Sequence, residues 1–375
     1  MSHHSSGEVL KAFGASEDVL EELLQYFDHS FESKGHIEQA IEDMPQISAY
    51  NGYVEEAKNV GAFEALRRQL KQLQLPVRAG MSQTESYKKV VLRGNNNTDS
   101  EMLALNAPDN ISLEVYEDEL IGKIPVLLVP NKEDFALFIC ALTNKNEPKE
   151  VPSSMGALFI NGLNNWGRIH RLKEDWISKN PFGNWSEEFK SNVLPNKSLY
   201  KDQLIILSEQ PYSNVSAENL QLDPTQWKSY SVAIRRAHEC AHLFTLQRYG
   251  KIKHHLFDEL IADYAGITSV LGRFQLEWFL HFMGLENPQQ YREGGRFQNY
   301  VPGLSDESRQ MLQKILVKAA INLANFDETL GAFKSPTCRK SRIQAICETG
   351  MLSIASADGV NQLMEKYNSH ETSLV

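Results

Sequence analysis

The sequence predicts an α+β protein that is mostly helical and contains one small sheet. Near the amino end, Ser16 precedes a run of apolar residues at helical spacing, from Val19 to Phe27, as expected for a capped amphipathic helix. Between residues 87 and 142 the chain changes to short segments rich in β-branched and aromatic residues, which are typical of strands. From Asp223 onward, helical patterns dominate again.

These changes of pattern divide the chain into four expected segments. Residues 1–76 form a helical region and residues 77–150 a small β-rich region, which together make an N-terminal lobe. The polar stretch 144–154 contains two prolines and is the expected linker. Residues 151–300 form a largely helical domain that carries the candidate site, and residues 301–375 form a C-terminal helical region.

Individual elements follow from local signals. Asp223 and Pro224 suit the cap and first turn of a long helix, and Gly250 suits its end, so we expect a helix over residues 224–249. Six strands are expected, at 87–93, 111–117, 124–129, 135–142, 155–162 and 203–209.

Composition excludes several classes of protein. The chain of 375 residues has 42% hydrophobic residues and a net charge of −10, which suits a globular protein and disfavours nucleic-acid binding. The four cysteines lie far apart, which favours reduced thiols over disulfides. No apolar run is long enough for a membrane span, and the first residues lack a secretory signal pattern. We therefore expect a cytoplasmic protein without a membrane partner.

The segment HECAH places two histidines one helical turn apart. His238 and His242 are spaced i, i+4, so both rings project from one face of the expected helix and can ligate one cation. Glu239 follows the first histidine, and its carboxylate can reach a water molecule beside that cation without being a ligand. This is the physical content of the H-E-x-x-H pattern.

A second pair of polar residues follows on the next expected helix. Glu259 and Asp263 are also spaced i, i+4 and lie in a mostly apolar segment. A hairpin of the two helices could bring Glu259 to the metal as a third ligand. Asp263 could then accept an N–H from a ligating histidine and fix the orientation of its ring.

HECAH followed by ELIAD resembles the zinc metallopeptidases of the gluzincin type, over about residues 235–266. The resemblance implies a metallopeptidase-like catalytic region within residues 151–300. It implies one Zn²⁺ per chain, bound by His238, His242 and Glu259, with Glu239 as general base and Asp263 behind the ligands. The expected function is a zinc-dependent hydrolase that cleaves an amide or peptide bond through a metal-activated water. Its substrate is a peptide, a protein or a small amide.

Two alternatives remain open. A non-catalytic or regulatory protein could use the same residues as a structural metal site, with His254 or His255 as a fourth ligand. The fragment ECAH is also half of a di-iron signature, but that architecture needs a second E-x-x-H, which the sequence lacks.

No single residue stands out as the donor that would stabilise a developing oxyanion. The candidates are tyrosines and histidines near the motif or elsewhere in the chain, namely Tyr249, His254, His255, Tyr264, Tyr200, Tyr212 and His170. The sequence does not indicate an oligomeric state.

Overall fold

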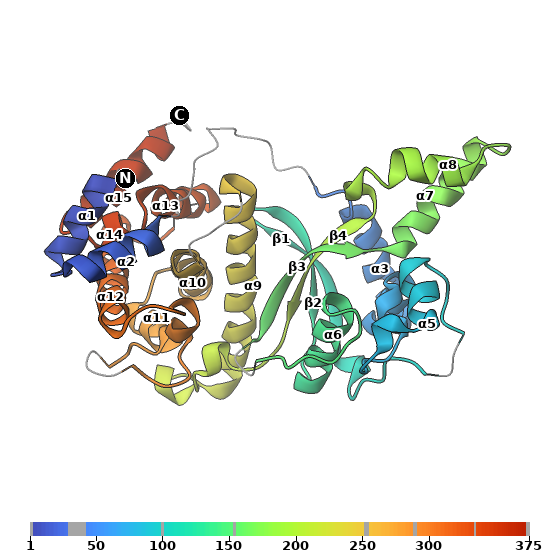
Figure 1. The fold of residues 1–375 in the computed structure, drawn as a ribbon, viewed down its shortest axis with the longest axis horizontal. Helices are drawn as coiled ribbons and strands as arrows, with labels where there is room; N and C mark the ends of the chain where they lie inside the picture. Colours follow the sequence, from blue (N-terminus) through green and yellow to red (C-terminus); the bar gives the residue numbers. More distant parts are fainter. Residues whose placement is uncertain are drawn as a thin grey trace. The chain divides into compact units, whose positions relative to one another are not determined.

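The computed structural model describes residues 3–28, 43–98, 101–152, 155–250, 255–287, 291–333 and 335–372. The predicted α+β class is confirmed, because in this part of the chain helices predominate and four strands form one sheet (Figure 1). The chain divides into two compact units. The first takes in Met1–Ala40, Glu119–Ile121 and Pro211–Val375, and the second takes in Ile41–Asp118 and Gly122–Gln210.

The sheet belongs to the second unit and has the strand order β1-β2-β4-β3. Its strands are β1 (Ser112–Asp118), β2 (Gly122–Leu128), β3 (Ala157–Asn164) and β4 (Lys201–Leu207). The outer pairs, β1–β2 and β3–β4, are antiparallel, whereas the central pair β2–β4 is parallel, with Val126 opposite Ile205.

Helices complete the second unit. They are α3 (Ile47–Val60), α4 (Ala62–Gln69), η1 (Lys71–Gln74), η2 (Met81–Gln83), α5 (Glu85–Tyr87), η3 (Lys88–Leu92), η4 (Pro108–Asn110), α6 (Lys132–Thr143), α7 (Trp166–Lys179), α8 (Trp185–Glu188), η5 (Phe189–Val193) and η6 (Lys197–Leu199). The core joins buried side chains of α3, α4 and α6 to those of the sheet, among them Tyr50, Leu66, Phe138, Leu127 and Ile206.

Four of the six expected strands are present, and two predictions were wrong. Residues 135–142 lie in α6, because the Asn131 side chain caps this helix by accepting from Asp134 N at 2.9 Å. An unbroken apolar run does not distinguish a strand from a buried helix. Residues 87–92 are also helical, since Thr84 caps α5 and Val90 and Val91 pack into a small apolar cluster.

The expected linker at 144–154 lies inside the second unit. The buried amide of Asn146 donates to Gln72 O at 2.9 Å and to Leu75 O at 3.0 Å, which ties this stretch to the end of η1. Residues 153 and 154 lie outside the described residues. The expected segments 1–76, 77–150 and 151–300 each contribute to both units, and the described sheet takes its strands from segments 77–150 and 151–300.

The described elements of the first unit are all helical. They are α1 (His3–Ala12), α2 (Glu17–Phe27), η7 (Tyr212–Asn214), η8 (Glu218–Leu220), α9 (Pro224–Tyr249), α10 (His255–Leu271), α11 (Leu276–Met283), η9 (Arg296–Tyr300), α12 (Asp306–Leu330), α13 (Pro336–Thr349), α14 (Met351–Ala355) and α15 (Gly359–Thr372). Helices α9 and α10 lie side by side in this unit (Figure 1).

Local signals at the ends of α9 act as predicted. The Asp223 carboxylate accepts from Thr225 N at 2.9 Å and from Gln226 N at 3.2 Å, and Pro224 occupies the first turn. Gly250 ends the helix with a φ of 84°, which side-chain-bearing residues rarely adopt. All four cysteines are buried and form no disulfide. No helix in the described ranges is both long enough and apolar enough to cross a membrane.

Candidate metal centre

The candidate site lies where α9 and α10 approach each other closely. Gly266 of α10 faces Ile234 of α9, and a Cβ added at Gly266 would lie 2.9 Å from Ile234 Cγ2 and 3.1 Å from Ile234 O. A larger residue at position 266 would force the helices apart. The glycine therefore permits the close helix pair on which the site is built.

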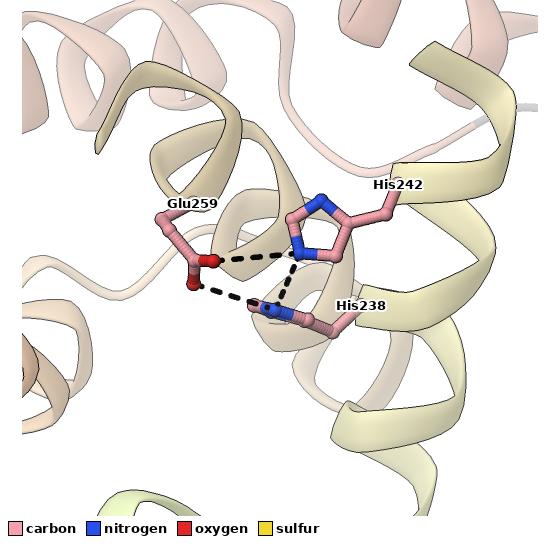
Figure 2. A group of neighbouring side chains, drawn as sticks. All are labelled: His238, His242 and Glu259. Atoms are coloured by element: carbon pink, nitrogen blue, oxygen red, sulfur yellow. Dashed lines mark hydrogen bonds and ion pairs between the residues drawn. The ribbon is translucent and has the colours of Figure 1, made fainter. Parts of the chain in front are cut away.

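Two turns of α9 and the first turns of α10 bring His238, His242 and Glu259 together (Figure 2). The two histidine Nε2 atoms are 3.0 Å apart. Glu259 Oε2 lies 3.5 Å from His238 Nε2, and Glu259 Oε1 lies 3.6 Å from His242 Nε2. The three residues that the sequence predicts as ligands thus face one point, and the cluster could hold a metal ion.

The separations of the donor atoms fit a small tetrahedral ion. Zinc–ligand bonds of 2.0–2.1 Å in a tetrahedron place neighbouring donors about 3.3 Å apart. The observed separations of 3.0, 3.5 and 3.6 Å bracket that value. Among the residues described, no fourth histidine, cysteine, aspartate or glutamate joins the cluster.

The imidazole of His238 is oriented from behind by two partners. Its Nδ1 lies 3.1 Å from Asp263 Oδ1 and 2.8 Å from the hydroxyl of Tyr212, which itself donates to Asp263 Oδ1 at 2.6 Å. Asp263 is fully buried. A carboxylate at Nδ1 keeps the proton there and leaves the lone pair on Nε2, which is the form that a metal requires.

The imidazole of His242 is held in the same way by a residue that the sequence analysis missed. Its Nδ1 lies 2.5 Å from Asp258 Oδ2, and Thr245 Oγ1 donates to the other oxygen of Asp258 at 3.0 Å. The Nε2 atoms of both rings therefore turn toward Glu259, on the side of each ring opposite the aspartate at Nδ1.

A cation from a distant part of the chain completes this network. Arg296, at the start of η9, donates from Nη1 to Glu259 Oε2 at 3.1 Å and to the Tyr212 hydroxyl at 3.2 Å. Its Nη2 donates to Asp263 Oδ2. The guanidinium also lies over the Tyr212 ring, 5.1 Å from the centroid.

The charges of these groups shift their pKa values in opposite directions. Burial alone raises the pKa of Glu259, but the hydrogen bond from His242 and the nearby cationic groups outweigh it, so the pKa lies well below its usual range. Burial alone lowers the pKa of His242, yet Asp258 and Glu259 raise it well above 6.5. Burial alone would lower the pKa of Arg296. Nearby groups, above all Asp263, raise this pKa above its usual value.

Glu239, the predicted general base, follows His238 on α9 and is only 9% exposed. One turn earlier lies Arg235, whose pKa is lowered to about 10 by burial, although the Tyr212 and Glu239 groups work in the other direction. Arg235 donates to Pro211 O at 3.0 Å and faces the Tyr212 ring from 5.5 Å. The base candidate is thus accompanied by an arginine on the same helix.

The candidate oxyanion donors have different surroundings. Tyr212 supports His238 and Asp263 from behind, and the Tyr264 hydroxyl donates to Asp327 at 2.5 Å. His254 lies outside the described residues, and so does the side chain of His255, so the fourth-ligand hypothesis stays a prediction. Of the remaining candidates, Tyr249 is the last residue of α9 in the first unit, whereas Tyr200 and His170 belong to the second unit.

Of the residues that support the cluster, the sequence analysis named Tyr212 only as a candidate oxyanion donor and did not name Asp258 or Arg296. Asp258 precedes Glu259 directly, so its place on the first turn of α10 was a signal that could have identified it. Tyr212 lies 26 residues before His238 and Arg296 lies 58 residues after it. No local sequence pattern links either residue to the motif. They reach the site only through the tertiary fold.

In a comparison with protein families, residues 8–358 match the model described as "Family of unknown function (DUF7005)". No curated protein and no solved structure matches the chain.

Proposed function

The chain belongs to the DUF7005 family, whose function is unknown, and we propose that it is a zinc-dependent hydrolase of amide or peptide bonds. The observation that carries the proposal is the donor set of His238, His242 and Glu259, in which both imidazoles are fixed through Nδ1. Such carboxylate–histidine pairs orient ligands in metal enzymes.

Glu239, directly after His238, favours a catalytic site over a structural one, because a structural site has no use for a general base there. Structural zinc sites are closed by four protein ligands, whereas catalytic sites keep one position for water or substrate. Two nitrogen donors and one carboxylate oxygen also suit zinc better than magnesium or calcium, which prefer oxygen ligands.

His238, His242 and Glu259 would hold a divalent ion, whose Lewis acidity would polarise an amide carbonyl and acidify a water molecule. The carboxylate of Glu239 would accept a proton from a water molecule and would deliver it to the nitrogen of the leaving group. Asp258 and Asp263 keep the imidazole protons on Nδ1 throughout. The buried position of Glu239 keeps bulk water away from the carboxylate that carries the proton.

Hydrolysis is tested by incubating the zinc-loaded protein with a diverse peptide mixture and a set of small amides, followed by mass spectrometry. We expect cleavage products from the wild type and a loss of at least about 100-fold in Glu239→Gln, because general acid–base catalysis contributes roughly that much. The control is Glu277→Gln, an exposed residue of α11. Equal turnover in Glu239→Gln and the wild type would refute the assignment of the base.

The structural alternative is tested without a substrate. Cobalt is substituted for zinc, and its visible spectrum is recorded before and after addition of acetohydroxamate. An open site takes up the added ligand and changes its spectrum, whereas a site closed by four protein ligands does not. An unchanged spectrum would favour the non-catalytic function.

A further inference from the structure

Arg296 and a bound metal ion would share the same carboxylate. Arg296 Nη1 donates to Glu259 Oε2, the oxygen that lies 3.5 Å from His238 Nε2. Its Nη2 donates to Asp263, the partner of His238 Nδ1. The guanidinium is therefore a cation of the chain itself that already pairs with the carboxylates of Glu259 and Asp263.

The backbone around Arg296 is constructed to hold it there. Gly295, directly before it, packs so closely on Gly284 that an added Cβ would lie 2.6 Å from Gly284 Cα and 2.6 Å from Met283 O. The same loop is fastened by Arg292 N, which donates to Gly284 O at 2.8 Å, and by the Tyr291 hydroxyl, which donates to Gly295 O at 2.5 Å. These backbone contacts of Arg292 and Gly295 hold Arg296 in place beside the cluster.

Burial strengthens the interaction between these charges. The side chain of Arg296 is 11% exposed, that of Glu259 is 13% exposed and that of Asp263 is fully buried. In such surroundings, an uncompensated carboxylate is strongly destabilising, and charges interact more strongly than in water. Arg296 therefore neutralises Glu259 and Asp263 when no divalent ion is present, and it repels a divalent ion when one binds.

From this geometry we infer that Arg296 is a built-in counter-ion of the metal centre. It keeps the metal-free site folded and lowers the affinity of the site for a divalent cation, so that the ion is exchangeable instead of being required for folding. The inference rests on the metal binding proposed above and not on the hydrolysis. By linkage, whatever stabilises the metal-free form more than the metal-bound form weakens metal binding by the same amount.

The test compares zinc affinity, measured by competition with a chromophoric chelator, and melting temperature with and without zinc in the wild type and Arg296→Met. We expect Arg296→Met to bind zinc at least about tenfold more tightly, because a like charge is removed from beside the ion. We also expect zinc to raise its melting temperature by about 3 °C more than it raises that of the wild type. Folding only in the presence of zinc is the extreme form of the same result.

Arg342→Met is the matched control, because Arg342 is a buried arginine of the same unit that pairs with Asp327 at 2.8 Å, outside the cluster. It should lower the melting temperature equally with and without zinc and leave zinc affinity unchanged. If Arg296 had only a structural role, Arg296→Met would behave like Arg342→Met. Unchanged or weaker zinc binding in Arg296→Met therefore overturns the inference.

If Arg296→Met does not fold either with or without zinc, Arg296→Lys tests the inference instead. A lysine keeps the charge but cannot donate to both carboxylates through a planar fork, so zinc binding should tighten by a smaller factor. Unchanged or weaker binding in Arg296→Lys overturns the inference. A wild type that binds no divalent ion would instead refute the proposed function, so the two failures are distinguishable.

Discussion

At the scale of single residues, the site consists of two imidazoles that each use one ring nitrogen for a carboxylate and turn the other toward Glu259. The Nδ1 partners are Asp263 for His238 and Asp258 for His242. In the metal-free protein, Asp258 and Glu259 outweigh the effect of burial and raise the pKa of His242, which favours a second proton on this ring. That proton occupies the region between the donors, which a metal ion must take over.

Zinc affinity should therefore fall as the pH falls. The pKa of His242 lies above 6.5 in the metal-free protein, so below that raised pKa each unit of acidification weakens apparent binding by up to about tenfold, and above it the dependence disappears. Chelator competition between about pH 6 and 8 measures this slope. Asp258→Asn removes a carboxylate that raises the pKa of His242, so its slope near neutral pH should be shallower. A flat wild-type profile over that range would contradict this account.

Much of the cluster was predictable residue by residue, because its ligands come from two local motifs with helical spacing. His238 with His242 and Glu259 with Asp263 are i, i+4 pairs, and the structure brings them together as the spacing suggested. Arg296 was not predictable, since its position depends on the contact between two glycines that carries its loop to the site. That His238, His242 and Glu259 bind a metal, with Asp263 orienting His238, stays a prediction.

At the scale of the elements, the site depends on the close contact of α9 and α10 at Gly266. A Cβ there would meet the side chain and the carbonyl of Ile234, and the carbonyl moves only with α9, while a β-branched side chain has few rotamers in a helix. Since Glu259 and Asp263 both lie on α10, a shift of this helix changes their distance from both histidines at once.

Gly266→Ala should consequently weaken zinc binding as well as stability. Overpacking of a close contact costs about 1–3 kcal/mol, which denaturant unfolding of the metal-free protein can measure. Gly7→Ala is the control, because Gly7 lies in α1 with no atom within 4 Å of an added Cβ. It should be neutral or slightly stabilising. If Gly266→Ala retained wild-type stability and zinc affinity, the close helix contact would not matter for the site.

The helix whose end signals entered the prediction was predicted well, whereas a helix whose cap was not used was assigned to a strand. The caps of α9 at Asp223 and Gly250 set its bounds in the sequence as in the structure. Residues 135–142 were assigned to a strand because apolar runs of this length suit either a strand or a buried helix. The decisive signal, Asn131 capping α6, lies upstream of the run itself.

At the scale of the whole molecule, the candidate metal centre and the sheet belong to different units. All of the described residues in the metal-centre network lie in the unit that takes in Pro211–Val375, whereas β1–β4 lie in the other unit. The sheet joins β2 to β4 in parallel across about 80 residues of chain. Such long-range pairing has no local signature, which is why the sequence assigned these strands to separate segments.

Zinc should protect one unit more than the other. Ligand binding stabilises the structure that forms its site, so hydrogen exchange should slow in α9 and α10 when zinc is added. The amides of β2 and β4 provide an internal comparison within the same sample. Equal protection of helices and sheet would show that the two units respond as one, contrary to this expectation.

The central claim is that His238, His242 and Glu259 bind a metal, and elemental analysis of purified variants tests it most directly. We expect one zinc ion per chain in the wild type, in Glu239→Gln and in the exposed-residue control Glu277→Ala, because none of these changes removes a ligand. We expect the zinc to be lost in Glu259→Ala. Undiminished zinc in Glu259→Ala, with the protein still folded, would contradict the ligand assignment and with it the proposed hydrolase.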